Sequence, residues 1–135
     1  MKEIDLAWLA GFFDGEGTIC ISPQKISHHY ALCISVASID RWILEWFSLA
    51  FNGKVNRQYR AKGNKRELWF WRIVDHQGEV ALRTLLPYLK LKKPQAELAL
   101  EFREARSYHK GQNTVNEAEL TLRESYRQKM STLNQ

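Results

Sequence analysis

Two carboxylates, Asp14 and Glu16, stand between glycines at the end of an apolar stretch that runs from Leu6 to Phe13. The residues that follow, Thr18 to Ser22, alternate between polar and apolar, so the periodicity changes at the acids. A carboxylate at such a junction is presented rather than packed. The stretch therefore predicts a helix that delivers an acid onto the element after it.

A second chemical signal is positive charge gathered in the middle of the chain. The net charge is only +5, yet residues 18–93 hold 13 of the 20 basic side chains and five of the 15 acidic ones. Within them, residues 54–66 carry six basic residues and no acid, with Asn, Gln and Tyr between. This composition is typical of a surface that meets phosphates and base edges. A solvated basic hairpin is the alternative.

The elements that must position these groups follow from periodicity and from turn residues. We expect a buried helix closed by Gly15 as a left-handed cap, a hairpin, and a second helix between Asp40 and Asn52-Gly53. A second hairpin and three further helices should come next. The expected ranges are 4–13 (helix), 18–24 and 30–37 (first hairpin, connected by 25–28), 40–51 (helix), 54–61 and 66–74 (second hairpin, turn at Gly63-Asn64), then helices 79–89, 94–108 and 116–133.

The alternation within the first hairpin sorts its side chains onto two faces. Ile19, Ile21, Leu32, Ile34 and Val36 form an apolar face, opposed by small, polar and nearly uncharged residues. In the second hairpin the alternation does not decide which face is buried, because both sets of alternate residues are apolar. One set is Leu68, Phe70 and Val74, and the other is Trp69, Trp71 and Ile73. We predict an α+β fold with a curved, antiparallel four-stranded sheet, helices on one face, and a polar face able to enter the major groove of DNA.

Length and composition limit the class of protein. A length of 135 residues is typical of a single domain. Cys20 and Cys33 fall in strand-like segments without a CxxC spacing, which favours a reducing compartment, although two thiols on neighbouring strands could lie close together. No apolar run is long enough for a membrane span. The acidic N-terminus favours mature sequence over a targeting peptide.

Small residues mark one side of the first helix. Ala7, Gly11 and Gly15 recur at every fourth position, with Ala10 beside them. Such a seam lets another backbone approach closely, and the chain has no second helix with this pattern. We therefore expect contact with the same helix of a second copy. Close packing of the helix inside a monomer is the alternative.

The stretch Leu9-Ala10-Gly11-Phe12-Phe13-Asp14-Gly15-Glu16-Gly17 resembles the signature nonapeptide of the LAGLIDADG homing endonucleases, with Glu16 in the place of the final Asp. Residues 86–92 (LPYLKLK), followed by Gln95-Ala96, resemble the segment that these enzymes carry after their second hairpin. The predicted αββαββα order is also theirs. The resemblance covers about residues 4–105, and residues 106–135 would be a C-terminal helical extension of the single domain.

The resemblance implies a hydrolase that makes site-specific double-strand breaks in long, pseudo-palindromic DNA targets with Mg²⁺, with Mn²⁺ or Ca²⁺ as other occupants of the site. One copy of the motif implies a homodimer, with no membrane or small-molecule partner. The expected dimer interface is Ala7, Trp8, Ala10, Gly11 and Asp14. An intron-homing nuclease would work in the cytoplasm of a microbe or phage-infected cell, or in an organelle matrix.

The resemblance also assigns roles at the site. Glu16 would bind the metal with help from the Gly15 backbone oxygen, while Asp14 would make hydrogen bonds at the helix end. Lys92 would polarise water or steady the scissile phosphate. Ser38 stands where relatives carry Gln or Asn to hold water, and because serine is shorter, Arg41 or Arg72 could compensate. We take Glu16, Lys92, Ser38 and Arg41 as the catalytic set.

The expected DNA contacts lie on the polar faces of the two hairpins. They are Ser22, Gln24, Lys25, His28, His29, Cys33, Ser35, Arg57, Tyr59, Arg60, Lys62, Lys65, Arg66 and Arg72. A zinc site at the two histidines lacks further ligands at suitable spacing. Two other functions stay open: a protein of this fold that has become an RNA-splicing maturase or a non-cleaving DNA-binding protein, and a dimeric scaffold without a nucleic-acid partner.

Overall fold

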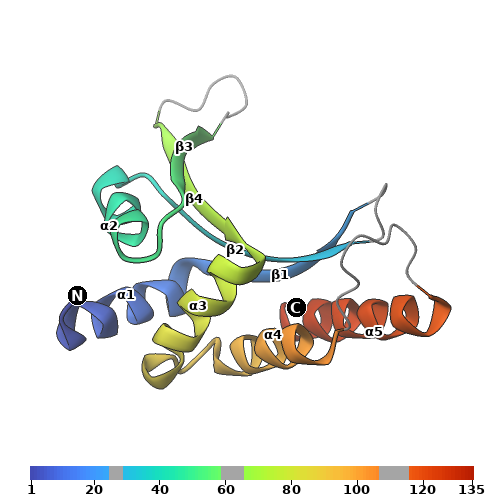
Figure 1. Cartoon of the computed structure of the whole chain (residues 1–135). Coiled ribbons are helices and arrows are strands. Elements are labelled where there is room, and N and C mark those ends of the chain that lie inside the picture. The colour runs from blue at the N-terminus through green and yellow to red at the C-terminus, as the bar shows by residue number, and fades with distance from the viewer. Residues whose placement is uncertain (25–28, 59–65, 107–115) are drawn as a thin grey trace.

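The computed structural model describes residues 1–24, 29–58, 66–106 and 116–135 (Figure 1). The elements are α1 (Glu3–Glu16), β1 (Gly17–Pro23), β2 (Tyr30–Ser38), α2 (Arg41–Phe51), β3 (Lys54–Gln58), β4 (Leu68–Val74), α3 (Asp75–Leu85), the 3₁₀ turn η1 (Leu86–Tyr88), α4 (Lys93–Ala105) and α5 (Glu117–Leu133). The predicted α+β order is confirmed. The predicted connections at 25–28 and Gly63-Asn64 lie outside the described residues.

The end of the first helix differs from the prediction. Gly15 does not cap α1 in a left-handed conformation, because the helix continues through Glu16 and the chain passes directly into β1. Gly17 takes an extended conformation there, with φ −76° and ψ 161°. A Cβ on Gly17 would lie 2.4 Å from the Phe13 ring, so glycine is needed for close approach and not for a positive φ. At the end of α2, by contrast, Asn52 and Gly53 have positive φ, and the helix ends before them as predicted.

The four strands form one antiparallel sheet in the order β1-β2-β4-β3. The hairpins therefore join through their second strands, with Ser35 opposite Arg72. Side chains of directly opposed residues share a face. The register settles the open question in β4: Trp71 and Ile73 are buried in the core, while Phe70 and Val74 face the other side.

All helices lie on the convex side of the curved sheet, and α5 runs beneath β1 and beside α4 (Figure 1). Leu9, Phe13, Leu82 and Phe102 are fully buried between the helices and the sheet. Helix α5 joins this core through Tyr126 and Met130. Its last turn is tied to the first strand, because the Asn134 amide donates a 2.9 Å hydrogen bond to the Ile19 carbonyl. Asn116 caps the start of α5, where its side chain accepts the Glu119 amide.

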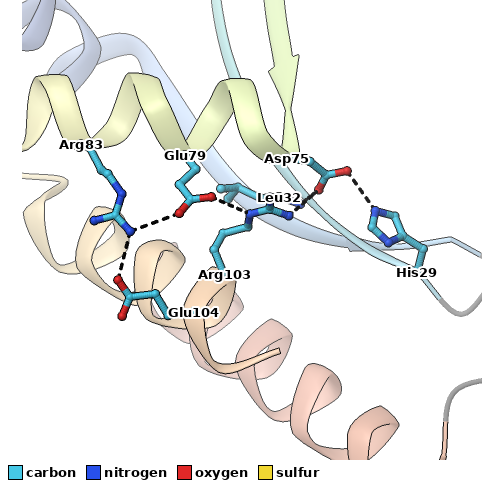
Figure 2. Close-up of polar contacts among 7 residues, drawn as sticks. All are labelled: His29, Leu32, Asp75, Glu79, Arg83, Arg103 and Glu104. Carbon is cyan, nitrogen blue, oxygen red and sulfur yellow. Dashed lines mark hydrogen bonds and ion pairs between the residues drawn. The ribbon is translucent and has the colours of Figure 1, made fainter. Parts of the chain in front are cut away.

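Asp75, at the start of α3, ties three elements together (Figure 2). Its carboxylate accepts the Leu32 amide of β2 at 3.1 Å, contacts the His29 ring at 3.0 Å, and pairs with Arg103 of α4 at 3.6 Å. Arg103 also pairs with Glu79. Asp75 has a positive φ of 49°, a conformation that costs about 1 kcal/mol in a non-glycine residue. These bonds offset that cost and fix the start of α3 against the sheet.

Candidate active site and nucleic-acid interface

Asp14 is a structural acid. It is 9% exposed, and its two carboxylate oxygens accept the backbone amides of Lys90 (2.7 Å) and Lys92 (3.0 Å). The prediction that it makes backbone hydrogen bonds is confirmed, but its partners lie in the segment before α4 and not at its own helix end. Hydrogen bonds to an ionised acceptor are worth more than neutral ones. The Asp14 clamp therefore fixes the 90–92 segment against the end of α1.

This clamp brings Lys92 to the helix end that carries Glu16. The Lys92 Nζ donates a 2.7 Å hydrogen bond to the Asp14 carbonyl, one of the terminal carbonyls that a helix leaves without an intrahelical partner. Glu16, two residues further on, is exposed. The structure thus places Lys92 at the end of α1 that carries Glu16, although the two side chains line different hollows.

Two open hollows flank this junction. We call the first the Glu16 hollow; it measures about 320 Å³ and is lined by Glu16, Thr18, Ser35, Val36, Ala37, Gln58, Phe70 and Arg72. We call the second the Lys92 hollow; it measures about 490 Å³ and is lined by Asp14, Gly15, Gly17, Thr18, Leu91, Lys92, Gln95, Leu133, Asn134 and Gln135. Thr18 borders both. An acid and two cations therefore stand around one end of the concave face.

Arg72, and not Arg41, lies near Glu16. Arg41 pairs with Glu45 at 2.8 Å and stacks over the Trp69 ring at 4.5 Å, and it lines neither hollow. Ser38 is also absent from both linings, and its hydroxyl accepts the Asp40 amide at 3.0 Å at the start of α2. Of the predicted catalytic set, Ser38 and Arg41 therefore lie at the β2–α2 connection, whereas Arg72 lines the same hollow as Glu16.

The concave face carries one row of side chains across all four strands. Thr18 opposes Ser35, Ser35 opposes Arg72, and Arg72 opposes Lys54. Asn56 and Gln58 of β3 share this face, since they oppose Phe70 and Leu68. Hydroxyl, amide and guanidinium groups can pair with base edges and phosphates, and an aromatic ring can meet a thymine methyl group. This face is the candidate DNA surface.

Several predicted DNA contacts need correction. Arg57 opposes Trp69, and so lies on the convex side with α2, where it pairs with Glu67 at 3.1 Å. Cys33 is on the concave face but is only 3% exposed. His29 is engaged by Asp75, as Figure 2 shows. Ser22, Gln24, Ser35, Arg66 and Arg72 retain at least partial exposure. Lys25, His28, Tyr59, Arg60, Lys62 and Lys65 lie outside the described residues.

Sequence reasoning missed Thr18, Lys54, Asn56, Gln58 and Phe70 as residues of this face. The sequence shows that side chains of the second hairpin alternate between two faces, but it does not show which face is buried. The signal that would have found them is Trp71. Once that large apolar side chain is assigned to the core, strand alternation places Phe70 and Arg72 on the other face. The strand register then places Lys54 and Asn56 opposite them on the same face.

The comparisons point to one family. DNA endonuclease I-CvuI of Chlorella vulgaris is 29% identical over 104 residues, which cover 73% of this chain and 63% of that protein. Its solved structure with its target in the presence of 2 mM Ca matches with a TM-score of 0.75 and 26% identity over 96% of this chain and 82% of that one. The LAGLIDADG meganuclease I-AabMI, bound to uncleaved DNA, matches with a TM-score of 0.59 and 21% identity over 95% and 43%. No family model matches the sequence.

The chain has the fold of the LAGLIDADG homing endonucleases, and its sequence is similar to that of DNA endonuclease I-CvuI. It spans 63% of the length of the curated relative that it matches. The nonapeptide motif occupies the last two turns of α1 and Gly17, so Asp14 and Glu16 both lie at the end of this helix. The predicted αββαββα core with added C-terminal helices is confirmed as the LAGLIDADG fold.

The motif helix corrects the predicted dimer interface. Ala10 is fully buried within the chain, and the Asp14 carboxylate is bonded to the 90–92 segment, so neither side chain is available to a second copy. Ala7, Trp8 and Gly11 are exposed. A Cβ built on Gly11 or Gly15 meets nothing within 4 Å, so the seam of small residues faces open space.

Within the described residues, no group of three or more His, Cys, Asp or Glu side chains gathers to hold a metal ion. Glu16 with the neighbouring backbone carbonyl of Gly15 is a hard oxygen pair, which suits Mg²⁺ or Ca²⁺ better than a soft transition metal. The described helices include none that is long and apolar enough to cross a membrane.

Proposed function

We propose that this chain is a site-specific homing endonuclease that hydrolyses phosphodiester bonds in both strands of double-stranded DNA. The observation that carries the proposal is the junction at which the Asp14 clamp holds Lys92 beside the helix end that presents Glu16, at one end of a concave face lined by polar and basic side chains. The likeness to an endonuclease solved with its DNA target supports it.

In this proposal Glu16 and the Gly15 carbonyl hold a divalent cation, normally Mg²⁺. Bound there, the cation would lower the pKa of a water and offset charge on the phosphate. The Glu16 carboxylate is exposed, so it can bind the cation without a rearrangement of the fold. The Asp14 carboxylate takes no part, since both of its oxygens already accept amides.

The two cations have distinct proposed roles. Lys92 keeps its ammonium beside the helix end through the Asp14 carbonyl and can donate its remaining protons to a phosphate oxygen. Arg72 lines the hollow that contains Glu16 and can contact a phosphate or a base edge from within the sheet. Asn56, Gln58 and Ser35 provide the sequence-reading contacts on the same face, and Lys54 contacts a phosphate.

We further propose that two copies associate through the exposed seam of α1. A double-strand break needs two active sites, and each chain contributes one Glu16. Close approach at Gly11 would bring the α1 ends, and with them the two carboxylates, to the two-fold axis. Exposed Ile4, at 74%, and Trp8, at 43%, would then be covered by the partner copy.

The test is a selection of cleaved sites from a randomised palindromic DNA library with Mg²⁺, comparing the unchanged chain with Glu16→Gln. We expect double-strand products from the unchanged chain and none from Glu16→Gln. Glu45→Gln is the matched control, since Glu45 is an exposed acid that pairs with Arg41 away from both hollows. Products that are identical for all three chains would overturn the proposal.

A second candidate is a DNA-binding protein of this fold that does not cut. It is favoured by one observation: the residue expected to hold the catalytic water, Ser38, bonds the Asp40 amide and lines neither hollow. Under this alternative, duplex DNA is bound with a steep salt dependence, no product forms with any divalent cation, and Glu16→Gln binds as well as the unchanged chain.

A further inference from the structure

Two thiols face each other on the concave side of the sheet, where Cys20 is partly exposed and Cys33 is buried. Cys20 of β1 and Cys33 of β2 are directly opposed in the antiparallel register, and both are free. Directly opposed residues in such a pair have Cα atoms about 4.5 or 5.5 Å apart, depending on the site in the ladder. Both separations fall within the range of about 4.4–6.8 Å that a disulfide spans. The backbone therefore already has the geometry for a cross-strand bond.

Arg72 completes this group. It lies diagonally across from Cys33, and its Nη2 donates a 3.1 Å hydrogen bond to the Cys33 sulfur. The hydrogen bond from the Cys20 thiol, together with Arg72, lowers the pKa of Cys33 to about 6 against the opposing effect of burial. The same hydrogen bond raises the pKa of Cys20. A lowered pKa favours the thiolate form of Cys33, which is the form that reacts with oxidants.

We propose that Cys20 and Cys33 are a reversible oxidation site, at which a hydroperoxide closes a cross-strand disulfide and thereby releases Arg72 to bind a DNA phosphate. The first half concerns the chain alone, and the second rests on the proposed DNA-binding function. In a reducing compartment, disulfides that form are transient and redox-sensing, which is the behaviour expected here.

The chemistry balances with hydrogen peroxide as the oxidant. The Cys33 thiolate attacks one oxygen, the O–O bond breaks, and hydroxide leaves, so that Cys33 carries a sulfenic acid. The Cys20 sulfur then attacks the Cys33 sulfur, the S–O bond breaks, and the departing hydroxyl takes the Cys20 proton and leaves as water. The two sulfurs are oxidised by two electrons in total, and the peroxide is reduced. A thiol reductant reverses the disulfide by exchange.

Oxidation changes the charge that Arg72 presents. In the reduced pair, the guanidinium bonds the Cys33 sulfur and favours its thiolate form. In the disulfide, both sulfurs are neutral, and Arg72 keeps its full charge and its donors. Arg72 lines the Glu16 hollow, and so stands where a phosphate is expected. One additional phosphate contact steepens the dependence of log K on log salt by about 0.9.

The site itself is tested without DNA. The full chain is treated with hydrogen peroxide, alkylated and digested with trypsin without reduction. Cleavage at Lys25 separates residues 3–25, which contain Cys20, from residues 26–41, which contain Cys33. We expect these two peptides to appear linked, from protein that runs as a single chain on a non-reducing gel, and to separate after dithiothreitol. Cysteines that stay alkylatable, or that become sulfinic acid without a link, would overturn the proposal.

Two variants sharpen the result. Cys20→Ser cannot form the link, and its Cys33 should instead be trapped as a sulfenic acid by dimedone. Cys33→Ser removes the thiolate partner of Arg72 without oxidation, so its binding to a labelled random-sequence duplex in Ca²⁺ should show the steeper salt slope before peroxide and no change after it. The unchanged chain should gain that slope only when oxidised.

The outcomes separate the two claims. A linked peptide with equal salt slopes for reduced and oxidised protein overturns the release of Arg72. If neither form binds duplex DNA, the proposed function fails, while the oxidation site is still judged by the linked peptide. Variants that fail to fold, checked by circular dichroism, leave the measurement on the unchanged chain decisive.

Discussion

The two faces of the sheet are built from alternate residues of the same strands, yet they differ in what fills them. On the convex face Ile19, Ile34 and Trp71 are essentially unexposed, and helices cover them. On the concave face Ser35, Phe70 and Arg72 alternate with those residues and border an open hollow. One face therefore stabilises the fold, while the other is free to carry charge, thiols and contacts to a partner. Substitutions at adjacent positions can separate these two tasks.

The largest contrast is expected at Trp71 and Phe70. Trp71 is fully buried, and its indole donates a 2.7 Å hydrogen bond to the Asn52 carbonyl, so Trp71→Ala should lower the free energy of unfolding by about 4 kcal/mol. Phe70→Ala, one residue away on the concave face, should cost less than about 1 kcal/mol and weaken DNA binding instead. Urea denaturation and a duplex-binding titration measure the two effects. Equal losses of stability would contradict the division of faces.

The next largest effect is expected at Asp14, which holds the 90–92 segment against the end of α1. Asp14→Asn keeps one accepting oxygen but turns an NH₂ group toward a backbone amide, so it should destabilise the chain by about 3 kcal/mol. Glu16→Gln, at an exposed position, should change the free energy of unfolding by less than about 0.5 kcal/mol while abolishing cleavage. An Asp14→Asn chain of unchanged stability would show that the clamp is unimportant.

Effects of intermediate size are expected at Gly17 and Gly11, two glycines of the motif. Gly17→Ala places a Cβ 2.4 Å from the Phe13 ring and should cost about 2 kcal/mol in thermal or urea unfolding. Gly11→Ala meets nothing and replaces glycine in a helix, so it should stabilise the monomer by up to about 1 kcal/mol. If the seam joins two copies, Gly11→Ala should also raise the dimer dissociation constant in sedimentation. A dimer unaffected by Gly11→Ala would argue against the proposed seam.

A smaller effect is expected on the concave face at Lys54, which opposes Arg72 and is exposed. Lys54→Ala should leave stability unchanged and reduce the salt slope of DNA binding by about 0.9, the value for one lost phosphate contact. Arg57→Ala is the control, because Arg57 belongs to the other face. The expectation fails if Arg57→Ala has the larger effect on the slope.

The smallest effect concerns the helix-covered side at acid pH. Arg127, together with the Tyr30 hydroxyl, lowers the pKa of Glu124 to about 2 from its ordinary 4.5. A lowered folded-state pKa gives stability that is present above 4.5 and lost as the pH falls toward 2. Glu124→Gln should therefore flatten the loss of stability between these values, with Glu117→Gln as an exposed control on the same helix. Parallel pH curves for the unchanged and Glu124→Gln chains would contradict this assignment.

The sequence determined the order of helices and strands, because apolar periodicity and turn residues such as Asn52-Gly53 act locally. It also determined the family motif and the pairing of Glu16 with Lys92 as candidate catalytic residues, through resemblance. The helix boundaries near Gly15 and Asp75 were missed, since the first depends on the Phe13 ring and the second on bonds to Leu32 and Arg103.

Only the tertiary structure decided which residues share a surface. Strand alternation fixes two sets of side chains but not which set is buried, and in the second hairpin the burial of Trp71 against α2 made that choice, placing Arg72 and Gln58 on the concave face and Arg57 behind it. Likewise, nothing local could show that Asp14 binds amides 76 and 78 residues away, or that Arg72 lies beside Cys33. The sequence raised the closeness of Cys20 and Cys33 only as a possibility, which the strand register decides. The physical reason is the same in each case: register and docking are set by packing between segments distant in sequence, which local propensity does not encode.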